Sequence, residues 1–534
     1  MIIAYKGLRE FEIQLLKQLE LMGRHPTFLS QVQLSQFYGI EIDKFACEIA
    51  KLSLWLAEHQ MNMIFKKNFG ESGPSLPLKE GGHIICGNAM RLDWEKVCPK
   101  DCTSEIYLLG NPPYRGASLQ TSEQKEDMAL VFKGVNNFRN LDYIACWFFR
   151  GAEYIKKSLK SQMAFVSTSS ICQGEQVAFL WPHILNANLE ISFAYQSFKW
   201  INNAKNNAGV ICTIIGIRCI SLKKKFLFKN NQVCIAENIN PYLYSGKNII
   251  IEKMKRPISL LPVMSYGSKP VDDGNFILSK DEKNEIINRY PTVIKLIKKF
   301  VGSDEFIKGK SRWCLWITDD NLSKTSDIPE ILNRISKVKI FRLKSSKKAT
   351  VESADIAHKF GEVRFKESDA IIIPTVSSEN REFLPVGFLD KKTIIANSAH
   401  AIYNAELYVF GLISSKMHMA WVKTTGGYLG SSIRYSSVIC YNNFPVPDLT
   451  NKQKQEIEFH VHNIIAEREK NPEKTIAELY DPKKMPKGLR EAHRNLDVAI
   501  ERFYRPKPFE SDEERLEHLF KLYGEMIQNE KKRN

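Results

Sequence analysis

The stretch EIYLLGNPPYRGAS, residues 105–118, decides how the rest of this sequence is interpreted. Four apolar residues, 106–109, predict a short buried strand that Gly110 ends. The strand is followed by two prolines between an amide and an aromatic side chain: Asn111, Pro112, Pro113 and Tyr114. Ligands of open α/β sheets bind just outside the carboxyl ends of the strands, so these four residues are placed to contact a substrate.

The Asn-Pro-Pro-Tyr tetrapeptide has the chemistry needed to hold a planar amino group. The prolines fix φ and disfavour helical geometry at Asn111, which sets the direction of its side chain and its carbonyl. The two oxygens of Asn111 can accept hydrogen bonds from the two hydrogens of an amino group. The ring of Tyr114 can stack on a planar base. A proline-rich turn without a functional role is the alternative, because proline pairs are common in turns.

The composition narrows the class of protein. A length of 534 residues leaves room for two to four domains. Because the chain has no apolar run of membrane-spanning length and no signal pattern, we expect no membrane partner and a cytoplasmic location. The 11 cysteines are scattered, mostly in apolar segments, and are expected to be reduced thiols. Cys98 and Cys102 form one close pair, but without a histidine or second pair nearby we expect no metal.

The formal net charge is +16, and one segment carries most of it. Residues 223–350 contain 26 Lys and Arg against 13 Asp and Glu, and they include Trp313 and Trp316. A solvated basic surface is the ordinary explanation of a lysine-rich stretch. An excess this concentrated, beside aromatic residues, favours a polyanionic partner, and nucleic acid above all.

The alternation of elements predicts three domains. Up to residue 222, strands alternate with helices in the pattern of a mainly parallel α/β sheet. The expected strands cover residues 37–42, 82–87, 106–109, 162–171, 190–200 and 208–220. Residues 223–450 have irregular periodicity and predict an α+β domain, and residues 451–534 predict a charge-balanced helical segment.

Two other predicted strands also end in polar residues. Glu41, with Asp43 as a less certain companion, stands where a carboxylate binds ribose hydroxyls in dinucleotide-binding sheets. Asn88 and the adjacent backbone of Ala89 are suited to the edge of an adenine. Each signal is weak alone, because strand-ending acids are common. If these residues lie at the same sheet edge as Asn111, the combination predicts a nucleoside cofactor beside a target amino group.

With these residues in place, the sequence resembles the class I S-adenosylmethionine-dependent DNA methyltransferases of the adenine-N6 type, and more closely the MmeI-like branch of type II restriction–modification enzymes. The resemblance covers nearly the whole chain. Its motifs are GNPPY, YGIEIDKFACEIAKLSLWLAEHQ, GNAMRLDW, FVSTSSICQGEQV, FKWINNAKNNAGVICTIIGI, SSENREFLPVGF, GGYLGSSIRYSSVICYNNFPVPD and LYDPKKMPKGLREAH. The last three are specific to that branch, whereas the tetrapeptide is shared with protein and RNA methyltransferases.

The resemblance implies a Rossmann-like methyltransferase sheet, a DNA target recognition domain, a C-terminal helical region, S-adenosyl-L-methionine as cofactor and double-stranded DNA as partner. It implies that Asn111 and Pro112 accept hydrogen bonds from the target amino group, within a motif that includes Pro113. Tyr114 and Phe198 would pack the two faces of a flipped adenine, a core phenylalanine being the alternative for Phe198. It also implies that Glu41 binds the cofactor ribose and Asn88 its adenine.

The sequence departs from the family pattern at its start. In the family, a strand and a glycine-rich turn precede an Ile-Ile-Ala-Tyr-type helix, whereas this sequence begins MIIAYKGLREFE. We therefore expect the first strand and the cofactor loop to be missing, and the chain alone to bind S-adenosylmethionine weakly. A DNA-binding remnant or specificity fragment that needs an upstream polypeptide is the alternative function. A protein or RNA methyltransferase fits the tetrapeptide but not the basic segment 223–350.

Overall fold

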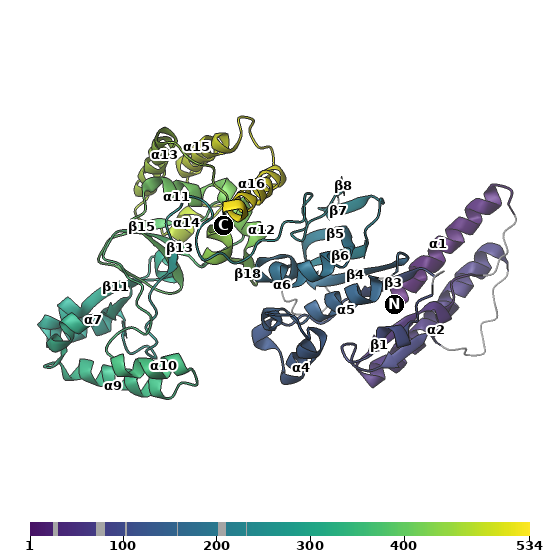
Figure 1. The fold of residues 1–534 in the computed structure, drawn as a ribbon, viewed down its shortest axis with the longest axis horizontal. Helices are drawn as coiled ribbons and strands as arrows, with labels where there is room; N and C mark the ends of the chain where they lie inside the picture. Colours follow the sequence, from purple (N-terminus) through teal and green to yellow (C-terminus); the bar gives the residue numbers. More distant parts are fainter. Residues whose placement is uncertain are drawn as a thin grey trace. The chain divides into compact units, whose positions relative to one another are not determined.

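The computed structural model describes residues 1–24, 30–70, 81–101, 104–156, 158–200, 210–230 and 232–533 (Figure 1). The chain forms two compact units. The first unit contains Met1–Ile171, Phe179–Phe198 and Cys212–Ile239. The second contains Cys172–Ala178, Lys199–Ile211 and Asn240–Asn534.

The centre of the first unit is a six-stranded sheet in the order β3-β4-β6-β5-β7-β8. Its strands are β3 (Ile106–Gly110), β4 (Ser161–Thr168), β5 (Leu189–Lys199), β6 (Ile211–Cys219), β7 (Lys225–Lys229) and β8 (Gln232–Ala236). β3 pairs with β4 and β5 with β7 in parallel, but β6 and β8 pair antiparallel with β4 and β7. The prediction of a mainly parallel sheet covers residues up to 222, where β3 and β4 fit it and β6 runs antiparallel. β7 and β8 lie beyond that range, and their short connection can join only antiparallel strands.

A second, two-stranded sheet in the first unit contains β1 (Tyr38–Glu41) and β2 (His83–Cys86), paired in parallel. Two long helices, α1 (Ile2–Leu21) and α2 (Lys44–Phe69), pack together and bury Tyr5, Leu54 and Phe65. α2 begins where Asp43 accepts a 2.7 Å hydrogen bond from the N–H of Ala46. It ends at Gly70, whose φ of 79° suits a glycine cap.

Helices also pack against the six-stranded sheet. α5 (Ala145–Ile155) lies against β4, with the rings of Phe148 and Phe165 5.5 Å apart edge to face. The approach is close at Gly151, where a Cβ atom would lie 2.5 Å from the sulfur of Met163. The remaining helices that begin or lie in this part of the chain are α3 (Trp94–Val97), α4 (Ser122–Val131) and α6 (Gly174–Leu185).

The second unit contains three small sheets, ordered β10-β12-β11-β16, β15-β13-β17-β9 and β14-β19-β18. Their strands are β9 (Ser265–Tyr266), β10 (Ile277–Leu278), β11 (Ile297–Val301), β12 (Trp313–Leu315), β13 (Ala370–Pro374), β14 (Val376–Ser377), β15 (Gly387–Leu389), β16 (Ile394–Ile395), β17 (Ala399–Tyr403), β18 (Gly427–Leu429) and β19 (Ser432–Arg434). Among them lie helices α7 (Lys280–Arg289), α8 (Ser303–Lys308), α9 (Pro329–Leu343) and α10 (Lys348–Glu352). This mixture agrees with the predicted α+β class.

The second unit also contains α11 (Leu407–Ser414) and α12 (Lys416–Thr425), which precede residue 451. Residues 451–534, where the sequence predicts a helical segment, contain α13 (Asn451–Glu469), α14 (Ile476–Leu479), α15 (Lys487–Tyr504) and α16 (Asp512–Arg533). α11, α13 and α15 pack on one another, as Figure 1 shows in green and yellow. Within the described ranges, no helix combines the length and apolar character needed to cross a membrane.

Candidate functional site

The Asn-Pro-Pro-Tyr turn leaves the sheet at the edge where β3 and β4 end, here called the carboxyl edge. Gly110 pairs with Phe165 of β4, and a Cβ atom at Gly110 would lie 3.3 Å from that ring. Asn111 is exposed, and no hydrogen bond within the described part of the chain occupies its side chain. Pro112 is buried beneath it. The turn therefore has a packed base and a free amide.

Tyr114 is half-buried, and its hydroxyl contacts another side chain. Its hydroxyl forms a hydrogen bond with the thiol of Cys212, and burial, followed by this contact, raises the pKa of Tyr114. Cys212 pairs with Thr168, the last residue of β4, so it lies at the carboxyl edge. No motif in the sequence connects this cysteine with the tyrosine, and sequence reasoning missed it.

Phe198 lies at the same edge. Arg218, at the end of β6, lies opposite Gln162, at the start of β4. Its Nε atom donates a 2.9 Å hydrogen bond to Glu190, at the start of β5. The start of β5 therefore lies at the same edge of the sheet as the start of β4. Half-buried Phe198, near the end of β5, lies toward the opposite, carboxyl edge. Residues 201–209, which belong to the same motif, lie outside the described residues.

Glu41 ends β1, and with Asp43 it stabilises the turn that follows the strand. The Oε1 atom of Glu41 accepts hydrogen bonds from the N–H groups of Ile42 and Asp43, over 2.8 and 3.1 Å. Asp43 uses one carboxylate oxygen as the cap of α2. Each residue keeps a second oxygen for a ligand, and Glu41 is the more deeply placed of the two.

Asn88 and Ala89 follow β2 at the same end of the two-stranded sheet, because Glu41 pairs with Cys86. The Oδ1 atom of Asn88 accepts from the N–H of Met90, and its Nδ2 donates to Asp127, both over 2.8 Å. The carbonyl of Ala89 accepts from the indole N–H of Trp94 over 2.8 Å. Asn88 is thus held in one orientation, with one amide hydrogen left over.

The structure adds residues to the site that sequence reasoning missed. Asp127 lies in α4, and Asp142 and Tyr143 immediately precede α5. Asp142 is a helix-flanking acid of a common kind, and Asp127 is one acid among several in its helix, so neither gave a distinctive signal. Their importance comes from contacts with residues 27 to 39 positions away.

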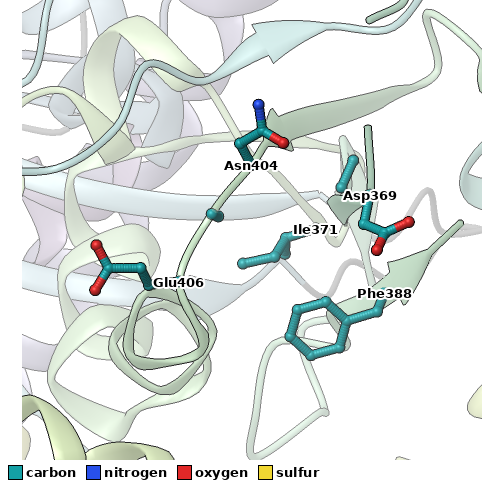
Figure 2. A pocket seen from close by; sticks show the side chains of 7 residues that line it. Asp369, Ile371, Phe388, Asn404 and Glu406 are labelled. Atoms are coloured by element: carbon teal, nitrogen blue, oxygen red, sulfur yellow. The ribbon is translucent and has the colours of Figure 1, made fainter. Parts of the chain in front are cut away.

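A shallow hollow of about 310 Å³ lies in the second unit. Its lining comes from the start of β13, from β15 and from the turn between β17 and α11: Asp369, Ala370, Ile371, Phe388, Asn404, Ala405 and Glu406. Figure 2 shows the two carboxylates on opposite sides of it. None of the predicted site residues lines it. In the ranges that the structure describes, no cluster of three or more His, Cys, Asp or Glu side chains could hold a metal; Cys102 lies outside these ranges.

Three family models match consecutive parts of the chain. Residues 1–229 match "MmeI, DNA-methyltransferase domain", residues 245–448 match "MmeI, target recognition domain" and residues 449–529 match "MmeI, C-terminal domain". Together these matches define a chain that consists of a methyltransferase-type domain, a target recognition domain and a C-terminal domain of the MmeI kind.

Two relatives extend over almost the whole chain. "DNA methyltransferase A" of Bacillus subtilis (strain 168) is 45% identical over 531 residues, which are 99% of this chain and 60% of that protein. The solved structure of the type IIL restriction–modification enzyme MmeI in complex with DNA is 41% identical, with a TM-score of 0.87, over 99% of this chain and 71% of that one. The chain belongs to the MmeI family of DNA methyltransferases and restriction–modification enzymes. It spans about 60% of the length of the Bacillus relative.

Proposed function

We propose that this protein is a site-specific DNA methyltransferase that methylates the N6 amino group of adenine in double-stranded DNA, within a type II restriction–modification system of the IIG kind. The observation that carries the proposal is the free, exposed amide of Asn111 beside the tethered ring of Tyr114 at the carboxyl edge. A planar amino group on an aromatic base is the substrate that this pair fits.

In this proposal, the chain's own residues hold and orient the target base. The oxygens of Asn111 and the carbonyl of Pro112 accept hydrogen bonds from the amino group and direct its nitrogen lone pair outward. Tyr114 and Phe198 pack the faces of an adenine that has left the duplex stack. The rate then comes mainly from proximity and orientation, without a covalent enzyme intermediate or a metal.

The residues at the ends of β1 and β2 fit the nucleoside end of S-adenosylmethionine. The second oxygen of Glu41 suits ribose hydroxyls, with Asp43 nearby, and the remaining amide hydrogen of Asn88 suits an adenine nitrogen beside Ala89. The cofactor supplies an electrophilic methyl group on its sulfonium. The residues at these two strand ends provide no cradle for its methionine end, so the fit covers the ribose and adenine only.

A second candidate is a DNA-binding specificity fragment, inactive until another polypeptide completes the cofactor site. The strand edges favour it. Among the described residues, β1 pairs only with β2, and β3 only with β4. Tyr107 and Leu109 of β3 are 60% and 59% exposed. An unpaired edge is a template for a further strand. In this candidate, a polypeptide with an apolar strand and a glycine-rich turn binds there and raises affinity for S-adenosylmethionine.

The test compares the parent protein with Asn111→Ala and with Asn136→Ala, an exposed asparagine in the turn after α4. Transfer of labelled methyl groups to unmethylated bacterial DNA is measured together with DNA affinity. We expect Asn111→Ala to lose more than about 90% of methyl transfer, because the target amino group is no longer oriented. The DNA affinity of this variant and both properties of Asn136→Ala should be unchanged. Transfer by Asn111→Ala within tenfold of the parent contradicts the assignment. A parent that binds DNA and becomes active only with an added polypeptide identifies the second candidate.

A further inference from the structure

Asp127 is a buried carboxylate at the junction of three segments. Its side chain is 2% exposed. Its Oδ2 atom accepts hydrogen bonds from Nδ2 of Asn88 and from the hydroxyl of Tyr143, each over 2.8 Å. Its Oδ1 atom accepts from Nε of Arg91 over 2.7 Å. Burial alone would raise its pKa, but the three hydrogen bonds outweigh it and the pKa of Asp127 is lowered. The group is therefore a charged acceptor at neutral pH.

Tyr143 connects this carboxylate to the other side of the site. Its backbone N–H donates a 3.0 Å hydrogen bond to the carbonyl of Arg115, the residue directly after Tyr114. The N–H of Arg115 donates in turn to Oδ1 of Asp142 over 2.8 Å. Both backbone groups of Arg115 are thereby held by residues 142–143. Asp127 and Tyr143 together thus join the turn after β2 to the turn after β3.

We propose that Asp127 and Tyr143 are positioning residues that fix the cofactor-side turn, residues 87–92, to the target-side turn, residues 111–116. This inference rests on the proposed function, in which the first turn faces the cofactor and the second holds the target amino group. Neither Asp127 nor Tyr143 touches the reacting atoms; they act through Asn88 and Arg115.

The physical reason for such a link lies in the geometry of the transfer. The amino nitrogen and the methyl group must meet in line, and an error of about 1 Å can cost about 100-fold in rate. The two turns follow strands of different sheets, β2 and β3, so no strand pairing holds them in register. A buried, ionised carboxylate with three donors is a rigid connection, because hydrogen bonds to charged groups are short and strong.

The test uses the full chain with Asp127→Asn and Tyr143→Phe, which keep the shape of each side chain. Hydrogen–deuterium exchange of the two turns is measured by mass spectrometry. The side chain of Asp127 does not contact residues 111–116, so the exchange of Asp127→Asn is measured at that turn. The side chain of Tyr143 does not contact residues 87–92, so the exchange of Tyr143→Phe is measured there. We expect exchange at least about fivefold faster in both cases, because local opening follows the loss of the link. This readout needs neither cofactor nor catalysis.

Methyl transfer gives the second readout. We expect each variant to lower kcat about tenfold or more, with the KM for DNA within threefold of the parent, because orientation and not DNA binding is lost. In the double variant with Asn88→Ala, Asp127→Asn should cause little further loss, because the two residues act as one unit.

Glu190→Gln is the matched control. Glu190 is also a buried carboxylate bound by an arginine, with Nε of Arg218 at 2.9 Å, but it lies at the opposite edge of the sheet. Its variant should leave exchange in both turns and kcat unchanged. The positioning role is overturned if Asp127→Asn and Tyr143→Phe leave exchange in the distant turn unchanged, or if their losses of kcat equal that of Glu190→Gln. This holds even when the parent is active. If the two variants exchange faster but the parent never transfers methyl groups, the result contradicts the proposed function, while the link itself stands.

Discussion

The N–H of Arg115 donates a 2.8 Å hydrogen bond to the carboxylate of Asp142, and this bond helps to fix the exit of the Asn-Pro-Pro-Tyr turn. The same oxygen accepts from the N–H of Ile144 over 3.2 Å. Burial raises the pKa of Asp142, opposed by hydrogen bonds from backbone N–H groups. The groups that contact this oxygen are backbone N–H donors, and an uncharged acceptor oxygen can also accept hydrogen bonds from them.

Substitution of Asp142 should separate its charge from its role as an acceptor. Asp142→Asn keeps an acceptor oxygen and should retain stability and methyl transfer within about threefold. Asp142→Ala leaves the N–H groups of Arg115 and Ile144 without that acceptor and should lower the free energy of unfolding by about 1–3 kcal/mol and reduce transfer. Urea denaturation and transfer kinetics measure both. Equal losses in the two variants would show that the charge itself is required.

The ring of Tyr114 is predicted to matter more than its hydroxyl. Tyr114→Phe removes the hydrogen bond to Cys212 but keeps the stacking face, so methyl transfer should remain within about fivefold. Tyr114→Ala removes the face, and stacking on a base contributes about 1–3 kcal/mol. We therefore expect at least about tenfold slower transfer for Tyr114→Ala. Comparable rates for the Phe and Ala variants would exclude stacking.

The basic segment should contribute affinity for DNA without sequence preference. Its exposed lysines on and near α9 and α10 include Lys337, Lys339, Lys347 and Lys348. Replacing all four with glutamine should weaken binding of every duplex about equally, because phosphate contacts carry no sequence information. The slope of log affinity against log salt should become shallower by about 0.9 for each phosphate that is no longer neutralised. Lys452→Gln, an exposed change on α13, serves as the control in fluorescence anisotropy. An affinity of the parent that is independent of salt would argue against DNA as the partner.

A buried acid in α15 should make stability depend on pH. Burial, with a contribution from nearby Glu501, raises the pKa of Asp497 to about 7, although the N–H of Lys416 donates to it over 2.7 Å. The folded state therefore binds the proton more tightly than the unfolded state, and this favourable term is complete below about pH 4 and lost as the pH rises through 7. Asp497→Asn should raise the free energy of unfolding at pH 8 by about 2–4 kcal/mol, with no gain at pH 4.

The comparison is made by urea denaturation at several pH values, with Glu491→Gln, an exposed change on the same helix, as the control. A gain from Asp497→Asn that is the same at pH 4 and pH 8 would show that Asp497 does not titrate in this interval.

The sequence predicts the strands next to the site well, because each is a short apolar run bounded by glycine or polar residues. It places Glu41, Asn88 and Asn111 at one sheet edge. The pairing of Glu41 with Cys86 brings the first two together, whereas Asn111 follows β3, which belongs to another sheet among the described residues. The sequence does not predict the link through Asp127, because a carboxylate in a helix does not indicate which distant hydrogen-bond donors will surround it. Pairings such as Phe300 with Ile394, between strands of five and two residues, are likewise fixed by tertiary packing and not by local pattern.

Arg342 illustrates the limit of counting charges. It belongs to the basic segment, yet its side chain is fully buried. Its guanidinium donates to the carbonyls of Val271, Ser353, Ile356, Pro270 and Lys359. This arginine joins two loops to the end of α9 and is not part of any surface for a polyanion. Composition supplied the sign of the segment's charge, but only the fold shows which cations face outward.

The open edge of β3 has a consequence for how the protein behaves at high concentration. Among the described residues, β3 pairs only with β4, so the backbone groups on its other side can pair with the same edge of another copy as readily as with a different strand. The purified chain should therefore self-associate as its concentration rises, and light scattering should show a mass that grows without a fixed stoichiometry. Leu109→Lys, a charge at that edge, should keep it monodisperse.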